Sequence, residues 1–261
     1  MITQIQSPGK SIWNPKPGAG LVMLALGGCL LASATPAGAQ AVEPTEPPKW
    51  ETSAALGFTL TDGNSDSILF TGDIRTERKW SHDEIRLRAE GAYGESEDVK
   101  NNEMARGTAQ WDHLFTERFY SFLRFEALHD AIADVEYRLT LSGGPGYYFI
   151  KNDRTLLSAE VGPGFIHEKL GSGEDDYITL RAGERFQYKI SDRARFFQSL
   201  EYLPQIDDFE NYLLNFEAGV EADITKKVAL RVTFQDTYDN QPAEGRERND
   251  IKLISSIAWK F

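Results

Sequence analysis

Apolar side chains alternate with small or polar ones up to the very last residue of this chain. Ile251, Leu253, Ile257, Trp259 and Phe261 fall on one side of this alternation, and the residues between them are mostly small or charged. A period of two is typical of a strand with one apolar face. The last residues of a soluble domain commonly fray. A large apolar side chain at the final position therefore predicts a strand whose end is held in the fold.

The same alternation recurs throughout residues 50–261. Short polar turns are expected around His82, Glu117, Asp153, Asp192 and Lys226. Counting the segments predicts about 12 antiparallel strands, each long enough for the roughly 9–11 residues of a tilted transmembrane strand. Between the short turns we expect longer, more acidic loops, at 94–103, 129–134, 169–176, 204–210 and 239–250.

Residues 1–39 have the three parts of a secretory signal peptide. Lysines without any acidic residue come first, an apolar run follows at 18–34, and Ala37-Gly38-Ala39 provides a small-x-small cleavage signature. This order is typical of a peptide that is removed on export. We therefore divide the chain into a signal peptide (1–39), a proline-rich periplasmic tail (40–49) and a strand-rich domain (50–261).

Cys29 leaves a second interpretation of this leader open. It follows Leu26-Gly27-Gly28, which fits a lipoprotein cleavage box, and cleavage there would leave Cys29 lipidated at the new N-terminus. Cleavage after Ala39 instead leaves a chain without cysteine, which suits an exported protein that does not depend on disulfides. The full chain carries a net charge of −12, so we expect no nucleic-acid partner.

The polar face of the strands decides between a soluble β-protein and a transmembrane barrel. About 8 strands already suffice for a filled interior, so a barrel of about 12 encloses more space than side chains fill easily. Its interior should hold water and charge, and its apolar face should meet lipid. The sequence therefore predicts a transmembrane antiparallel up-and-down β-barrel. The side chains predicted to line its lumen are Arg86, Arg88, Glu90, Arg106, Arg124, Glu126, Arg138, Arg181, Arg185, Glu217, Glu221 and Arg231.

Aromatic residues near the strand ends are typical of the girdles that outer-membrane barrels place at the two membrane interfaces. The predicted set is Trp50, Trp80, Trp111, Phe119, Tyr120, Tyr147, Tyr148, Phe149, Tyr188 and Trp259. The terminal pattern Ile257, Trp259 and Phe261 is typical of the signal that the barrel-assembly machinery reads. The last strand should pair with the first, because an unpaired edge in lipid leaves backbone groups unsatisfied.

Several segments together resemble a known family. They are "GFTLTDGNSDS" (57–67), "GGPGYYFI" (143–150), "AEVGPGFIHEK" (159–169) and the terminal "AWKF". Over roughly residues 50–261 the chain resembles the YdiY-like proteins, which are described as salt-induced outer-membrane proteins and are also known as domain-of-unknown-function family 481. The resemblance implies a barrel in the outer membrane of a Gram-negative cell and a link to salt or osmotic stress. The family has no established catalytic residues, so no residue role carries over.

Two functional interpretations of the lumen charges stay open. Arginine and glutamate on one face can pair across the lumen and close it, which gives an envelope-stabilising barrel, or they can line a narrow aqueous channel. We expect no catalytic residue, cofactor or metal centre. The alternatives are a hydrolase acting on outer-membrane lipid through His129 or His167, and a soluble periplasmic β-protein. The expected partners are outer-membrane lipid and, at the acidic segments 62–66 and 171–176, divalent cations. The oligomeric state is left open.

Overall fold

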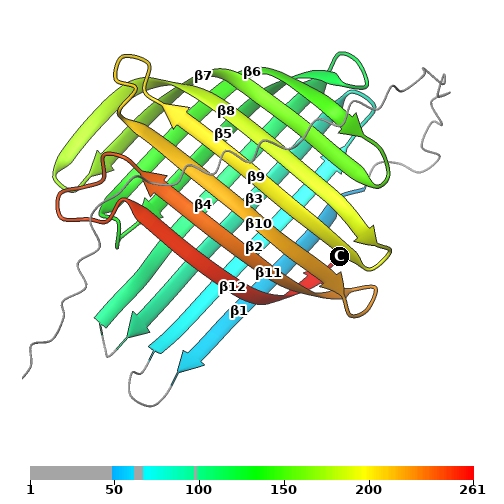
Figure 1. The fold of residues 1–261 in the computed structure, drawn as a ribbon, viewed down its shortest axis with the longest axis horizontal. Coiled ribbons are helices and arrows are strands. Elements are labelled where there is room, and N and C mark those ends of the chain that lie inside the picture. The colour runs from blue at the N-terminus through cyan, green and yellow to red at the C-terminus, as the bar shows by residue number, and fades with distance from the viewer. Residues whose placement is uncertain (1–48, 62–66, 97–98) are drawn as a thin grey trace, which may run out of the picture. The chain divides into compact units, whose positions relative to one another are not determined.

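The computed structural model describes residues 49–61, 67–96 and 99–261. Within these residues, twelve strands form one closed antiparallel barrel, in which each strand pairs with its neighbours in sequence. In Figure 1 the yellow-to-red strands cross in front of the cyan-to-green strands. The predicted fold class, a transmembrane up-and-down barrel, is confirmed. The strands are β1 (Glu51–Thr61), β2 (Ser67–Lys79), β3 (Asp83–Ser96), β4 (Val99–Leu114), β5 (Phe119–Asp130), β6 (Val135–Lys151), β7 (Thr155–Leu170), β8 (Gly173–Ser191), β9 (Ala194–Pro204), β10 (Tyr212–Asp223), β11 (Val228–Asp239) and β12 (Asn249–Lys260).

Four predictions fall wholly or almost wholly on residues that the structure does not describe. These are the signal peptide, the lipidation of Cys29, the proline-rich tail at 40–49 and the acidic segment 62–66. No helix in the described part of the chain is long and apolar enough to span a bilayer.

The barrel closes where its first strand meets its last. β1 and β12 pair from Ser53 opposite Lys260 to Gly57 opposite Ser256, and the Phe261 amide donates to the Thr52 carbonyl at 2.9 Å. The prediction that the last strand pairs with the first is confirmed, and the pairing extends to the final residue. We call the end of the barrel where β1 begins and β12 ends the terminal end, and the opposite end the loop end.

The exterior of the barrel is apolar. Leu56 is 63 % exposed, Phe70 53 % and Leu253 70 %, and each lies on the outward side of its strand. A soluble protein rarely exposes a continuous apolar band of this kind, because the band loses contact with water only when another apolar phase covers it. The hydrocarbon of a bilayer supplies that phase. The alternative of a soluble β-protein therefore fits this exterior poorly.

The predicted aromatic girdles need one correction. Trp50, Trp111 and Phe149 are exposed on the exterior as expected. Tyr120 and Tyr148 are instead fully buried inside the barrel, where their ring centroids lie 4.8 Å apart. Adjacent residues of a strand face opposite sides, so a run of neighbouring aromatic residues such as 147–149 cannot all meet lipid.

Apolar side chains also fill part of the lumen at each end. One cluster lies at the terminal end and another at the loop end. The two clusters are Leu114, Tyr120, Phe122 and Tyr148, and Ile166, Tyr177, Leu203 and Leu213. The glycine-rich segment of β6 makes room for the first, because a Cβ added at Gly146 would lie 2.4 Å from the Tyr120 ring. The interior is therefore aqueous only where charged side chains replace these clusters.

Two of the five expected acidic loops, 94–103 in its described residues and 169–176, are mostly strand, whereas those at 204–210 and 239–250 are mostly connections as expected. β7 and β8 are separated only by Gly171 and Ser172, and Gly171 has a positive φ of 54° that suits this tight turn. Asp175 and Asp176 belong to β8. The backbone ladder satisfies its hydrogen bonds in water as well as in lipid, so the strands continue beyond the apolar band with polar side chains. The longer described connections are 205–211 and 240–248.

Candidate functional site

The side chains predicted for the lumen all lie on the inner face of the barrel. Arg231 is 2 % exposed and Glu221 1 %, while Arg86 and Arg106 line an interior cavity. The alternation within each strand explains this placement, because a period of two fixes the face of every residue once one residue is placed. That these side chains line a path for solutes remains a prediction.

Ion pairs join opposite walls of the lumen through Arg88 on β3. Its guanidinium lies 2.5 Å from Glu90 on the same strand and 2.8 Å from Asp73 on β2. It also lies 2.8 Å from Glu217 on β10, which Arg75 of β2 approaches at 3.2 Å. β3 and β10 are far apart in the strand order, so the Arg88–Glu217 pair ties one wall to the other.

Arg231 on β11 is the most enclosed arginine of the network. Its guanidinium lies 2.8 Å from Asp73 and 2.8 Å from Glu221, which is fully buried. Arg195 and Lys260 also approach Glu221, at 3.2 and 3.1 Å. A buried ion pair offsets its desolvation only when further hydrogen bonds satisfy it. Arg231 donates to Glu221, Asp73 and Ser53, whereas Glu221 Oε1 has ion-pair partners but no hydrogen bond among the described residues.

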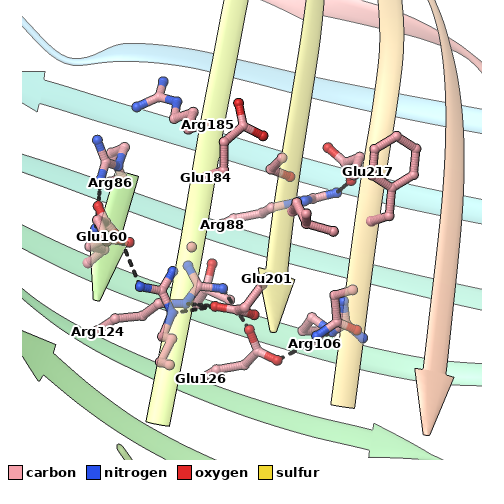
Figure 2. A pocket seen from close by; sticks show the side chains of 18 of the residues that line it. Arg86, Arg88, Arg106, Arg124, Glu126, Glu160, Glu184, Arg185, Glu201 and Glu217 are labelled. Atoms are coloured by element: carbon pink, nitrogen blue, oxygen red, sulfur yellow. Dashed lines mark hydrogen bonds and ion pairs between the residues drawn. The ribbon is translucent and has the colours of Figure 1, made fainter. Parts of the chain in front are cut away.

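A second part of the network surrounds Arg181 on β8. Arg181 lies 2.5 Å from Glu201 and 2.7 Å from Glu160. Figure 2 labels both of these carboxylates. Arg124 of β5 lies 2.8 Å from Glu126 and 3.4 Å from Glu201, so it connects β5 with β9 across the lumen. Alternating guanidinium and carboxylate groups thus continue around the interior.

Arg138 forms a separate connection at the loop end. It pairs with Glu168 of β7, and its Nη2 donates to Asp239 of β11 at 2.8 Å. Tyr177 Oη also donates to Glu168, at 2.9 Å. Together with the apolar cluster described above, this connection narrows the loop end of the lumen.

Several interior charges were absent from the predicted set. Asp73 and Arg75 could have been predicted from the sequence, since they alternate with the apolar residues of β2. Asp112 and Glu160 were harder to predict, because uncharged residues flank each of them on the inner face of its strand, Gln110 and Leu114 for Asp112 and Ser158 and Gly162 for Glu160. Asp112 lies 2.7 Å from Arg86. Glu160 accepts a hydrogen bond from Gln110 at 2.7 Å.

The open space of the lumen decreases from the terminal end to the loop end. A cavity of about 590 Å³, which we call the vestibule, reaches Glu51 and Phe261. The central cavity, of about 200 Å³, shares Arg86 and Arg124 with it. A third cavity of about 20 Å³ lies beside Arg138. It has room for little more than one water molecule.

Glu184 is a charged residue on the lipid-facing side. The register of β8 places it opposite Ala159 and Leu200, and Gln198 Nε2 donates to its carboxylate at 3.2 Å. The strand has no bulge at this point, since the register shift of the β8–β9 pair lies between Lys189 and Ser191. The amide of Gln198 supplies a polar partner that lipid does not offer.

The histidines proposed for a hydrolase contact a backbone carbonyl and a carboxylate in the described part of the chain. His129 Nδ1 is 2.8 Å from the Glu136 carbonyl, and His167 Nδ1 is 2.6 Å from Asp176. No serine hydroxyl is hydrogen-bonded to either ring in the described ranges. Among these residues there is also no group of three or more His, Cys, Asp or Glu side chains arranged to hold a metal ion.

A search of curated proteins found no match. Solved structures with a similar fold include a channel from Pseudomonas putida F1, with 10 % identity, 85 % of this chain and 100 % of that chain covered, and a TM-score of 0.48. Another is the NanC porin, with 6 % identity, 81 % and 98 % coverage, and a TM-score of 0.46. At these identities and TM-scores neither carries an argument about activity.

The sequence itself gives the clearer relationship. The family model of DUF481, described as a protein of unknown function, matches residues 54–261. This range covers nearly all of the barrel, from within β1 to the last residue. The match agrees with the resemblance drawn from the glycine-rich segments and the terminal strand. The chain therefore belongs to the DUF481 family.

Proposed function

We propose that this protein is a narrow outer-membrane channel for small charged solutes. The observation that carries the proposal is the continuity of the vestibule and the central cavity, which share Arg86 and Arg124 in their walls. Both signs of charge line this space, so ions meet a polar path rather than an apolar plug. The apolar exterior and the terminal pattern at Ile257, Trp259 and Phe261 support residence in the outer membrane and recognition by the barrel-assembly machinery.

The loop end sets the conductance of such a channel. Arg138, Leu203 and Leu213 border the smallest cavity, of about 20 Å³. A solute passes this point only in single file with water, or after the Arg138–Asp239 pair opens. We therefore expect a small conductance with brief closures. The terminal end faces the periplasm in this orientation, as in bacterial barrels whose short turns lie on that side.

A second candidate function is a closed barrel that stabilises the envelope. The pairs that cross the lumen, such as Arg88–Glu217 and Arg138–Asp239, favour it because they hold the walls together. A link to salt or osmotic stress rests on the family resemblance alone. The ion pairs of the wider, wetter part of the lumen would weaken at high ionic strength.

Single-channel recording of the refolded chain, without residues 1–39, in a planar bilayer separates the two candidates. The channel proposal expects steady openings in the wild type and a larger conductance in Arg138→Ser, which removes the connection at the loop end. Leu214→Ala, on the outward side of β10, is the matched control and should leave the conductance unchanged. A wild type and an Arg138→Ser variant that are both folded and silent would establish the closed barrel instead.

A further inference from the structure

The vestibule differs from the rest of the molecule in the sign of its charge. Nine basic and six acidic residues line it, whereas the central cavity is lined by six basic residues and, apart from the outward-facing Glu184, five acidic ones. The whole chain is strongly acidic, with a net charge of −12. Basic side chains are therefore concentrated in the vestibule of a protein that is acidic as a whole. A concave surface of one sign, between low-dielectric walls, raises the local concentration of counter-ions.

Three acidic residues of the vestibule, Glu217, Glu221 and Asp223, are already engaged by part of its basic set, whereas Glu51 and Asp192 have no ion-pair partner among the described residues. Glu217 is shared by Arg75 and Arg88, at 3.2 and 2.8 Å. Lys260 neutralises Glu221 at 3.1 Å and also pairs with Asp223. The basic groups that are left over lie on one wall, along β8 and the turn that follows it.

We call these basic groups without a close carboxylate partner the surplus, and Arg185 is its inner member. It lines both the vestibule and the central cavity, and it appears beside Arg86 in Figure 2. Its only carboxylate neighbour in the described chain is Glu77, at 3.7 Å. Glu77 is shared with Lys79, at 3.3 Å. The planar fork of a guanidinium suits two parallel hydrogen bonds to a carboxylate or phosphate, and here no protein group supplies them.

Lys189 is the outer member of the surplus. It lies on the same inward side of β8 as Arg185, about 13 Å nearer the mouth at 3.3 Å per residue. Among the residues that the structure describes, no carboxylate lies within ion-pair distance of its ammonium. Gln187 lines the wall between them and adds an uncharged polar group. The three side chains form a path of donors that leads from the mouth to the central cavity.

We propose that the vestibule is a binding site for a small oxyanion, a carboxylate or a phosphate, held at Arg185 and attracted by Lys189. The site goes beyond the channel function, because a closed barrel would bind the anion in the same place. An oxyanion beside Arg185 would supply the bidentate partner that this guanidinium lacks. The dianionic phosphate should bind more tightly than acetate, since each additional charge interacts with Lys189 and Arg86.

Isothermal titration of inorganic phosphate into the full refolded chain in detergent, at low ionic strength, tests the site. We expect saturable binding to the wild type and weaker binding of acetate. Arg185→Gln should weaken phosphate binding about tenfold, the effect of losing one charge-assisted bidentate contact. Lys226→Gln removes the same charge from an exposed turn residue outside the vestibule, and it should bind phosphate as the wild type does.

Two results would overturn the site. One is a folded wild type that gives only the heat of dilution, and the other is an Arg185→Gln variant that binds phosphate with unchanged affinity. Heat-modifiable migration on gels confirms folding, and Lys189→Gln provides a second variant if Arg185→Gln does not fold. A barrel that is silent in bilayers but binds phosphate keeps the site and loses the channel. A conducting barrel that binds no phosphate would support the channel and overturn the binding site.

Discussion

The central cavity and the vestibule are lined by the same types of charged residue, but these residues are paired differently in the two places. In the central cavity, carboxylates surround each of the key guanidinium groups, as with Arg181 between Glu160 and Glu201. In the vestibule, Arg185 has only a distant carboxylate and Lys189 has none among the described residues. Paired charges hold walls together, whereas unpaired ones remain free to attract a solute. The position of each partner, rather than the number of charges, separates structural from functional charge in this barrel.

The largest expected effect is a loss of stability when a buried, fully paired arginine is removed. Arg231→Leu would remove the closest partner of the buried Glu221 and one of the three arginines around Asp73, so the free energy of unfolding should fall by about 3–5 kcal/mol. Urea unfolding in detergent, followed by tryptophan fluorescence, measures it. Arg193→Leu, in the turn after β8, is the matched control with no carboxylate partner among the described residues. An equal decrease in the free energy of unfolding for both variants would contradict the contrast between paired and unpaired charges.

A double-mutant cycle sharpens the contrast between close and distant pairs. Arg88→Gln and Glu217→Gln, separately and together, should give a coupling energy of about 1–3 kcal/mol, because their 2.8 Å contact crosses the lumen. The same cycle on Arg185 and Glu77, which lie 3.7 Å apart, should give less than about 0.5 kcal/mol. Equal coupling energies in the same unfolding assay would show that Arg185 is paired after all.

Ionic strength should separate the two regions in one experiment. Phosphate affinity should fall severalfold between about 0.1 and 1 M sodium chloride, because the Debye length drops from roughly 10 to 3 Å and chloride competes for the vestibule. The urea midpoint should change little, since the central pairs are enclosed by the barrel wall. Titrations and unfolding curves at matched salt concentrations provide both readings. A phosphate affinity independent of salt would contradict an electrostatic site.

The smallest expected effect is on stability at the mouth. Lys189→Gln removes an exposed charge without an ion-pair partner in the described chain, so unfolding should change by no more than about 0.5 kcal/mol. The same variant should still bind phosphate more weakly than the wild type. A clear decrease in the free energy of unfolding, measured beside the phosphate titration, would mean that Lys189 stabilises the fold and is not simply available to bind a solute.

The sequence predicted the faces of the strands well because a period of two leaves little freedom. Arg86, Arg88 and Glu90 could be placed inside from Leu87 and Ala89 alone. The partners of these charges could not be predicted, because Arg88 and Glu217 meet only after the ring has closed. The enclosed pair Tyr120 and Tyr148 was misplaced, since composition near a turn says nothing about which of two adjacent rings faces lipid.

The lengths of the connections were predicted less well. Acidic residues such as Asp175 and Asp176 are common in loops, yet here they extend a strand that has already begun. A hydrogen-bonded ladder does not end at the edge of the apolar band, because its backbone groups remain paired in water. The surplus in the vestibule was invisible for a related reason. It depends on Glu217 being engaged by Arg75 and Arg88 of distant strands.

The closing seam gives the wall of the barrel one weak line. β1 pairs with β2 from Glu51 to Thr61, but its described pairing with β12 ends at Gly57. Small side chains, Ala55 and Ala258, face the interior beside this short join. Under lateral tension in the bilayer, the wall should therefore part here first, beginning at the loop end and travelling toward the chain termini. The join that completes the cylinder during insertion is also the one that would unzip first.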